Sequence, residues 1–368
     1  MPATSNPTSD SCRPSRRLLW WARSGHEDGR NRVVRAALAQ LNVTVDFFTP
    51  RTRQWSAFEA MLARVERPDV VWVPVFRHRD VLGAARWCRR RKVPLVFDPL
   101  ISQYDKQVFE KQRFAEDSSA AQRLLKRERI LLTQPQAVLV DTQAHSDYFE
   151  NTLAVNASKL HVVPVGAEEG LFEPEEKAQT QRNAGPFRVV FVGSFISLQG
   201  PQVIVEAARR CPDIQWTLVG EGPDRSVCEA AAQGLANVQF KPWQNYRDLP
   251  SVIRAADVAL GVFGASEKAQ RVVPNKVHQA LACGVPVITR VGTGYPPELP
   301  STSEGLVFVK PDDPDALATA IRAMAEQSSE AMAAQRRGAR LVFDTWFGPA
   351  SIRQALIRVL DATLCDVQ

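Results

Sequence analysis

Short runs of β-branched and aromatic residues alternate along this chain with longer amphipathic stretches, which is typical of an α/β protein with parallel sheets. The first series of runs predicts six strands, at residues 18–24, 44–48, 69–75, 93–100, 137–142 and 160–166. The second series predicts six more, at 187–194, 214–222, 238–241, 257–263, 285–289 and 306–310. The stretches between them predict helices at about 30–40, 55–66, 79–91, 105–132, 200–210, 224–233, 248–255, 275–283 and 314–326.

The two series are separated by an acidic stretch with proline, glycine and little apolar periodicity, which is typical of a linker. The length of 368 residues also favours two domains, because single cores stop growing near about 250 to 300 residues. We therefore expect two doubly wound, Rossmann-like domains that face a cleft and bind ligands at the carboxyl ends of their strands. The expected boundaries are a flexible tail at 1–15, a first domain at 16–172, a linker at 173–186, a second domain at 187–346, and a final helix within 347–368 that packs back on the first domain.

The formal net charge of +6 is unevenly distributed between these domains. Residues 1–92 contain 18 Lys+Arg against 8 Asp+Glu, whereas residues 166–368 contain 20 against 23. The basic excess therefore belongs to the first domain, and part of it crowds one predicted helix and its end, at Arg86, Arg89, Arg90, Arg91 and Lys92. This cluster could be an ordinary solvated surface, or it could bind an anionic membrane or a lipid-linked acceptor. Few aromatic residues are interleaved, which argues against nucleic acid.

Other features of the composition narrow the class further. The chain has no run of 18 uncharged apolar residues, so we expect no membrane-spanning helix. Its six cysteines are scattered without a C-x-x-C pair or a suitably spaced histidine, which disfavours a zinc site. The polar, Pro- and Ser-rich start favours a flexible tail over a signal peptide. We expect a reduced, cytoplasmic protein, with peripheral contact at the inner membrane as an open alternative.

Two glycine turns follow strands of the second series: VGSFISLQG, which contains Gly193, and LVGEGP, which contains Gly220 and Gly222. Glycine after a parallel strand lets backbone amides approach a phosphate, and the following helix start favours the negative charge. Neither turn fits G-x-G-x-x-G or contains a Walker lysine. A tight turn without a ligand is therefore an equal alternative.

The segment 260–289, LGVFGASEKAQRVVPNKVHQALACGVPVIT, places charge around a predicted helix start. A polar loop comes first, and Pro274 then suits the first turn of the helix. The polar and turn-forming residues are Glu267, Lys268, Arg271, Pro274, Asn275, Lys276 and Gln279. Three cations and several amide donors around one helix start would suit a diphosphate, whereas a solvated charged loop is the plainer alternative.

One glycine and several polar residues also lie at or just beyond the strand ends of the first series, facing the expected cleft. They are Gly25, His26, Arg30, Arg77, Asp98, Ser102, Tyr104, Asp105, Asp141, Thr142 and His145. We expect them on the acceptor side, with Asp98 and His145 the best candidates for contacts to an acceptor or a donor sugar. Ordinary helix caps are the alternative for Asp and Thr after a strand.

The motifs FVGSF, LVGEGP, NVQFKPW and PNKVHQALACGVPVIT occur in this order over about 100 residues of the second half. This ordered set resembles the nucleotide-sugar-binding domain of the retaining glycosyltransferases of family four, which have the GT-B fold. The first half is similar to a bacterial branch of that family, often of surface-polysaccharide clusters, through HEDGRNRV, VPVFRHRD, VFDPLISQYDKQV and VDTQAHSDYF.

The resemblance implies transfer of a sugar from a nucleotide-sugar donor, held by the second domain, to a glycan, lipid-linked or small-molecule acceptor, held by the first. Retention of configuration is implied, with no metal and no cofactor. The donor residues that it implies are Gly193, Ser194, Phe195, Gln199, Gly220, Glu221, Gly222, Trp243, Gln244, Glu267, Pro274, Asn275 and Gln279. The catalytic residues that it implies are Lys268, Arg271, Lys276, Asp98 and His145, and fixed cations suit a leaving diphosphate that gains negative charge.

This sequence departs from the family at Arg271 and Gln279, which stand where the family has the two Glu residues of its Glu, seven residues, Glu motif. Arginine cannot accept a hydrogen bond from a sugar hydroxyl as glutamate does. Ser194 and Gln199 stand where the family has basic residues, a loss that the cations of 260–289 would restore. These departures leave a non-catalytic binding or scaffold protein open, and a nucleotide-sugar epimerase on the same fold is a further alternative.

Overall fold

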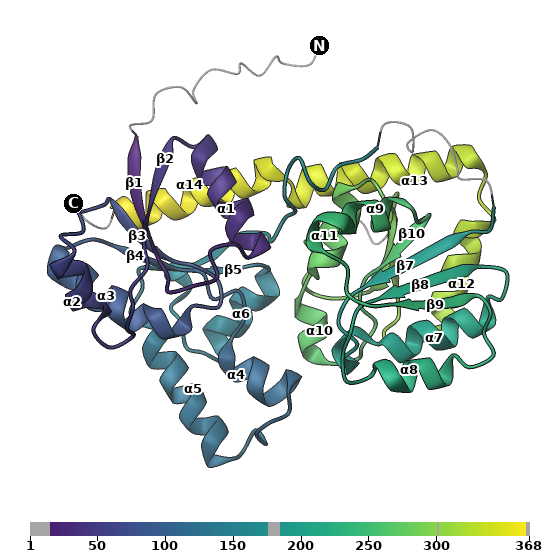
Figure 1. Ribbon diagram of the computed structural model, residues 1–368, viewed down its shortest axis with the longest axis horizontal. Helices are drawn as coiled ribbons and strands as arrows, with labels where there is room; N and C mark the ends of the chain where they lie inside the picture. The colour runs from purple at the N-terminus through teal and green to yellow at the C-terminus, as the bar shows by residue number, and fades with distance from the viewer. Residues whose placement is uncertain (1–14, 176–184, 300–301, 366–368) are drawn as a thin grey trace, which may run out of the picture.

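The computed structural model describes residues 15–175, 185–299 and 302–365, which form two α/β domains side by side (Figure 1). Each domain is built around one sheet, as the alternating pattern predicts. Residues 1–14 of the expected tail and 176–184 of the expected linker lie outside the described residues.

The sheet of the first domain has six parallel strands in the order β2-β1-β3-β4-β5-β6. They are β1 (Arg16–Trp21), β2 (Val43–Phe48), β3 (Val70–Val73), β4 (Leu95–Phe97), β5 (Ala137–Val140) and β6 (Leu160–Val162). In β1, Leu18 and Trp20 belong to the core on one face of the sheet, and Leu19 and Trp21 belong to the core on the other. Helices cover both faces, which explains why these strands read as continuous apolar runs.

The longer helices of the first domain are α1 (Gly29–Gln40), α2 (Ser56–Leu62), α3 (Val81–Arg91), α5 (Ser119–Leu132) and α6 (Gln143–Asn151). The stretch 105–132 is mainly helical, as the sequence predicted, but it is interrupted and does not form one helix. Helix α4 (Gln103–Asp105) and the π-helical turn η3 (Lys106–Glu110) come first, and Gln112 then has a left-handed φ of 48° that ends the helical path. The chain becomes helical again where the Ser118 side chain accepts a hydrogen bond from the Ala121 N–H and begins α5.

The sheet of the second domain has the order β12-β13-β11-β10-β7-β8-β9. Its parallel strands are β7 (Arg188–Val192), β8 (Gln215–Val219), β9 (Val238–Lys241), β10 (Val258–Leu260), β11 (Val287–Arg290) and β13 (Leu306–Val309). The edge strand β12 (Thr302–Ser303) pairs antiparallel with β13 and was not predicted. The helices are α7 (Pro201–Arg210), α8 (Arg225–Ala231), α9 (Leu249–Arg254), α10 (Glu267–Arg271), α11 (Asn275–Ala282), α12 (Pro314–Ala325) and α13 (Ser329–Val342).

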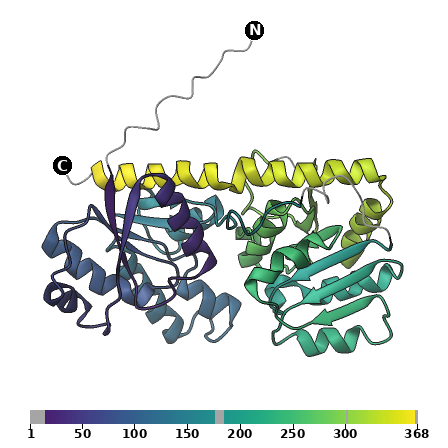
Figure 2. The same ribbon diagram turned by 45° about the horizontal axis from the view of Figure 1, so that its top comes forward.

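The last helix, α14 (Pro349–Cys365), returns to the first domain after the π-helical turn η8 (Phe343–Phe347). Figure 2 shows α13 and α14 along one side of both domains. Ile352, Leu356 and Val359 are buried in the core that also contains Leu18 and Trp20 of β1. The C-terminal helix therefore contributes to the core of the first domain. Within the described ranges, no helix is both long enough and apolar enough to cross a membrane.

Candidate functional site between the two domains

Asp98 directly follows β4 and forms a buried ion pair with Arg30 of α1. Arg30 Nε lies 2.7 Å from Asp98 Oδ2, and Arg30 Nη1 also donates to the carbonyl oxygens of Val163 and Pro164. Burial raises the pKa of Asp98, and the charge of Arg30 opposes this rise. Arg30 Nη2 and Asp98 Oδ1 have no hydrogen-bond partner among the described residues. The pair therefore retains one donor and one acceptor that a ligand could satisfy.

Residues at the end of β5 reach the second domain. Thr142 caps α6, because its side-chain oxygen accepts a hydrogen bond from the His145 N–H at 3.1 Å. The same hydroxyl donates to the carbonyl oxygen of Arg271 at 2.7 Å. Burial alone would raise the pKa of Asp141, but the charge and the hydrogen bond of His145 Nδ1 lower it overall. Thr142 is thus both a helix cap and a contact between the domains.

The segment before Pro274 is a short helix and not the polar loop that the sequence predicted. Helix α10 begins where the Ser266 side chain accepts a hydrogen bond from the Ala269 N–H. This turn brings Lys268 and Arg271 to the first domain, because residues three apart lie on one face of a helix.

Lys268 and Arg271 form ion pairs with carboxylates of the first domain. Lys268 Nζ lies 3.1 Å from Asp105 Oδ2 and 2.6 Å from Glu110 Oε2, and Arg271 Nη2 lies 3.0 Å from Asp105 Oδ1. The Arg271 guanidinium also lies 4.3 Å from the ring centroid of Tyr148. We call Asp105, Glu110, Lys268 and Arg271 the interdomain clasp. Lys268 and Asp105 are almost fully buried in it.

Lys276 lies at the first glycine turn, apart from the clasp. Its Nζ is 2.5 Å from Gln199 Oε1 and 3.7 Å from the ring centroid of Phe191. Burial lowers the pKa of Lys276 well below its usual value, and no described carboxylate lies within ion-pair distance. The expected cluster of three cations at one helix start is therefore wrong, because two of them are held in the clasp by acids of the other domain.

The two glycine turns pack against each other. A Cβ at Gly193 would collide with Lys276 Nζ and Gln199 Oε1, so only glycine lets this lysine reach the turn. Gly220 has a φ of 140°, and a side chain there would collide with the Gly193 carbonyl. Gly222 lies against the backbone of Phe195 in the same way. The second turn thus supports the first, which favours a structural role for Gly220 and Gly222.

The other predicted donor residues surround these turns. The Phe195 ring is fully buried in the core, so only its backbone could meet a donor. Ser194 is half-buried beside Gly193, and the exposed Glu221 pairs with Arg225. After β9, Trp243 is 49% exposed, and Gln244 donates to a carbonyl of its own loop.

The start of α11 carries the last predicted donor residues. Pro274 precedes its first residue, Asn275 is exposed there, and Gln279 is buried three residues beyond Lys276. Glu267 of α10 is exposed and lies 3.7 Å from Arg271.

The remaining acceptor-side residues lie elsewhere in the first domain. Ser102 Oγ and the Tyr104 N–H both donate to the buried Glu128 of α5, at 2.9 and 2.7 Å. A Cβ at Gly25 would meet the side chain of Arg77. His26 packs edge-on against Phe47 of β2, the outermost strand of the sheet. The structure therefore does not bring His26 together with Asp98 and His145.

Three residues of this region were missed by the sequence analysis: Glu110, Glu128 and Tyr148. Each lies on a helix or helical turn and not at a strand end, so the pattern that marked the other candidates does not mark them. Glu110 closes the clasp, and Glu128 holds the loop that carries Asp105.

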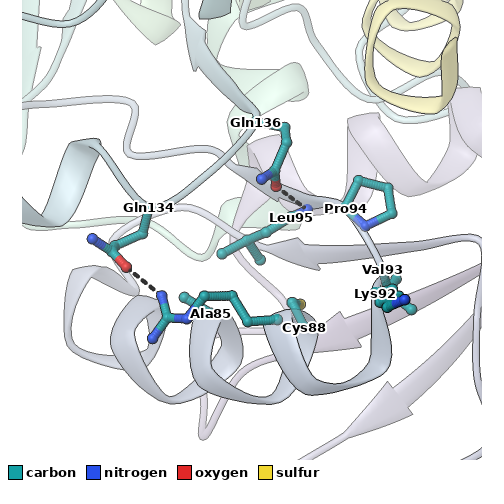
Figure 3. Close-up of a pocket in the computed structure, with 9 residues that line it drawn as sticks. Ala85, Cys88, Lys92, Val93, Pro94, Leu95, Gln134 and Gln136 are labelled. Atoms are coloured by element: carbon teal, nitrogen blue, oxygen red, sulfur yellow. Dashed lines mark hydrogen bonds between the residues drawn. The ribbon is translucent and has the colours of Figure 1, made fainter. Parts of the chain in front are cut away.

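A hollow of about 250 Å³ lies at the opposite edge of the first sheet, where β4 and β5 begin (Figure 3). Cys88, Lys92 and Gln134 line it, and the Gln136 side chain there accepts a hydrogen bond from the Leu95 N–H. Burial raises the pKa of the Cys88 thiol to about 12, so this thiol stays protonated at neutral pH and is a poor nucleophile. In the described part of the chain, no group of three or more His, Cys, Asp or Glu side chains could hold a metal ion.

Two Rossmann-like domains with charged residues between them, and a C-terminal helix that returns from the second domain to the first, define the GT-B class of fold. The structure of Anabaena HepE in complex with UDP and glucose is similar, with a TM-score of 0.69 over 94% of this chain and 100% of that chain, at 17% identity. At this level of identity, the likeness shows the fold alone.

The family follows from the sequence matches. A model of the glycosyl transferases group 1 matches residues 186–327, and a model of the glycosyl transferase 4-like domain matches residues 20–166. The chain belongs to this glycosyltransferase family, which confirms the resemblance to glycosyltransferases of family four.

Two curated relatives are both D-inositol 3-phosphate glycosyltransferases. That of Segniliparus rotundus is 30% identical over 45% of this chain and 39% of the relative. That of Mycobacteroides abscessus is 28% identical over 67% of this chain and 58% of the relative. The chain thus spans less than two thirds of the length of these relatives.

Proposed function

We propose that this chain transfers a sugar from a nucleotide-sugar donor to an acceptor, with retention of configuration and without a metal or cofactor. Family membership, relatives named as glycosyltransferases and a UDP complex of a protein with the same fold support this proposal. The observation that carries it is Lys276, a buried amine without an anionic partner that lies against the Gly193 turn. A diphosphate at this turn would supply the missing negative charge.

Lys276 would act mainly on the leaving group. Charge on the departing nucleoside diphosphate grows in the transition state, so a fixed cation in a water-poor site stabilises that state more than the bound donor. The acceptor hydroxyl oxygen would bond to the anomeric carbon as the bond from that carbon to the diphosphate oxygen breaks. The hydroxyl proton would pass to an oxygen of the leaving diphosphate.

Lys268 and Arg271 would serve this reaction by holding the domains together. Both are already paired with Asp105 or Glu110, so a phosphate would have to displace a carboxylate to reach them. We therefore assign them to closure of the cleft, a step that excludes water from the reacting groups. This role also accounts for Arg271 at a position where the family has glutamate.

The first domain would supply the contacts to the sugar and the acceptor. The Arg30–Asp98 pair offers one unused donor and one unused acceptor, as sugar hydroxyls require. His145 Nδ1 forms a hydrogen bond with Asp141. Its Nε2 is therefore the ring nitrogen that would form a hydrogen bond with a substrate hydroxyl.

A panel of nucleoside diphosphates and nucleotide sugars tests the function. The thermal midpoint is measured with each ligand, and release of diphosphate is then measured with and without acceptors. A ligand at 100 times its Kd should raise the free energy of unfolding by about 2.7 kcal/mol. Slow donor hydrolysis that depends on Lys276 would support the proposal, with the exposed Lys310→Ala as the control. Binding of no nucleotide would contradict it, and interconversion of the sugar without transfer would identify an epimerase.

We also propose that the protein works in the cytoplasm against an anionic membrane, through a surface formed by α2 and α3. Trp55, Phe58 and Leu62 on this surface are 65%, 50% and 68% exposed. Helix α3 lies beside α2 in Figure 1, and Arg90 Nη1 is 3.5 Å from Met61 Sδ. Exposed aromatic and aliphatic side chains next to arginines suit the interface of an anionic bilayer.

Sedimentation with lipid vesicles tests this surface. The full chain should sediment with anionic vesicles and less with zwitterionic ones. The triple variant Arg89→Glu, Arg90→Glu, Arg91→Glu should lose this binding, and Trp55→Ser should weaken it. The exposed Arg337→Glu, on α13 of the other domain, is the matched control. Unchanged binding in the triple variant would contradict the proposal.

A further inference from the structure

The first domain contains a cavity of about 440 Å³ that five arginines line, and it shares Arg77 and Glu128 with the region described above. Arg23 follows β1, Arg77 and Arg79 follow β3, Arg53 precedes α2, and Arg127 lies on α5. The cavity therefore lies at the edge of the sheet where the strands end, as Asp98 does. Its wall also includes the first residue of α4, the short helix whose last residue is Asp105 of the clasp.

Most of the positive charge of this cavity is not balanced by the protein. Arg23 pairs with Asp80 at 2.7 Å, and Arg77 donates to the Ser24 hydroxyl. The guanidinium groups of the other three arginines make no hydrogen bond or ion pair with a described residue; they are Arg53, Arg79 and Arg127.

The second carboxylate that lines the cavity, Glu128, is not an ion-pair partner of these arginines. Glu128 accepts hydrogen bonds from the Ser102 hydroxyl and from the N–H groups of Gln103 and Tyr104. Its oxygens thus face the α4 loop, and Oε1 also lies 3.6 Å from His78 Nε2. Burial raises the pKa of its carboxyl. The cavity is therefore an anion-binding environment with three available guanidinium groups.

Two further observations point to a ligand at this cavity. Phe76 has a left-handed φ of 61°, a costly conformation for a bulky residue, and the residue is 39% exposed. Strain of this kind persists where the surrounding structure enforces it, and it is enriched at binding sites. The almost fully buried His78 also lines the cavity; its Nε2 lies 3.6 Å from Glu128 Oε1 but makes no hydrogen bond with a described residue. An aromatic ring beside arginines suits a ligand with both an apolar or sugar surface and a negative charge.

We propose that this cavity binds a phosphate group of the acceptor, with Arg53, Arg79 and Arg127 as its main ligands and Phe76 against the adjoining part of the acceptor. The acceptor role rests on the proposed glycosyl transfer, whereas binding of the phosphate does not. The phosphate could belong to a soluble sugar phosphate or to a lipid headgroup. Arg53 lies two residues before Trp55 of the α2 surface, so the cavity is close to the face that we propose for the membrane.

Titration of the full chain tests the proposal without any donor present. The soluble probes are glucose 1-phosphate and glucose, and the lipid probes are phosphatidylcholine vesicles with and without phosphatidic acid. We expect binding of at least one phosphate probe and none of its uncharged counterpart, with an affinity that falls as salt is added. Binding of glucose 1-phosphate would indicate a soluble acceptor. Binding of the phosphatidic acid vesicles alone would indicate a lipid-linked one if it persists in the triple variant Arg89→Glu, Arg90→Glu, Arg91→Glu, which removes the proposed membrane surface.

The double variant Arg79→Gln, Arg127→Gln should weaken phosphate binding by about tenfold or more, because each arginine makes charge-assisted hydrogen bonds. Both side chains are exposed, so the thermal midpoint should be preserved. The exposed Arg123→Gln, on the same helix but outside the cavity, is the matched control. The thermal shift with UDP should be the same in all three proteins, which separates this proposal from the donor site. Wild-type affinity in the double variant, or no phosphate binding by the wild type, would overturn it.

Discussion

Two groups of cations in this protein differ in what balances their charge. Lys268 and Arg271 lie between the domains, are largely buried, and form ion pairs with carboxylates of the other domain. Arg53, Arg79 and Arg127 lie around a cavity of one domain, are exposed, and have no described partner. The first group is committed to the protein itself, and the second is available to a ligand. The role of a cation near a cleft, structural or ligand-binding, therefore follows from its ion-pair partners and not from how many cations lie there.

Lys276 combines features of both groups, since it is buried like the clasp but unpaired like the cavity. The largest expected effect is therefore at this residue. Lys276→Met should lower kcat/KM by about 10²-fold or more, as for removal of one fixed donor to a developing anion. The same variant should raise the free energy of unfolding at pH 7. The lowered pKa means that the unfolded chain binds a proton there more strongly than the native state, and methionine removes that penalty.

Steady-state kinetics and urea unfolding of Lys276→Met test this pair of effects. Lys310→Met is the control, because its side chain is exposed at the end of β13 and lies outside the site. Full activity in Lys276→Met would contradict the role of this amine. Loss of both activity and stability would show that Lys276 has a structural role, like Lys268 and Arg271 of the clasp.

Much of the fold could be predicted from the sequence. The strands of a parallel sheet that is covered on both faces are continuous runs of apolar residues, which can be recognised without knowing their neighbours. The six strands of the first domain and the glycine turns of the second were found in this way. Strand β12 was missed because two residues are too few to show an alternation of hydrophobic and polar positions. Helix α13 was missed although it is amphipathic, since its many polar residues and Gly338 obscure the pattern.

The pairing of the site residues could not be predicted in the same way. Both Asp105 and Arg271 were placed at the cleft, but 166 positions separate them, and nothing local shows that they meet. Glu110 became a partner of Lys268 only because η3 follows α4 in place of a regular helix. The arginine cavity draws on five separate segments of the chain, so no short motif marks it.

A smaller effect is expected from acid, and it concerns the histidine of the arginine cavity. Burial lowers the pKa of His78 from 6.5 to about 4, and the nearby charges of Lys106 and Arg77 act in the same direction. Glu128 lies 3.6 Å away and is itself buried. The unfolded chain therefore takes up this proton as pH falls below about 6.5, whereas the native state does not until about pH 4.

His78 should thus contribute a loss of about 2 kcal/mol in the free energy of unfolding between pH 7 and pH 5. Urea unfolding of His78→Gln at these two values measures it. His278 of the second domain is the matched control, because burial also lowers its pKa to about 4. Each variant should remove about half of the loss that the two histidines share. An unchanged pH dependence in His78→Gln would mean that the native cavity admits the charged ring.

The smallest effect on stability is expected in the clasp itself. Asp105→Asn removes a carboxylate that faces Lys268 and Arg271, and in a fixed interior such a loss costs about 3 to 5 kcal/mol. Here the two cations belong to another domain, so they can regain water when the domains separate. We therefore expect a cost nearer the ~1 kcal/mol of an exposed pair, together with a larger radius of gyration by X-ray scattering and tighter binding of UDP. Asp117→Asn, an exposed change in the same segment, is the control. A loss of several kcal/mol in the free energy of unfolding, with an unchanged radius of gyration, would show that the clasp belongs to a rigid interior. The clasp cations would then differ from the cavity arginines in burial alone.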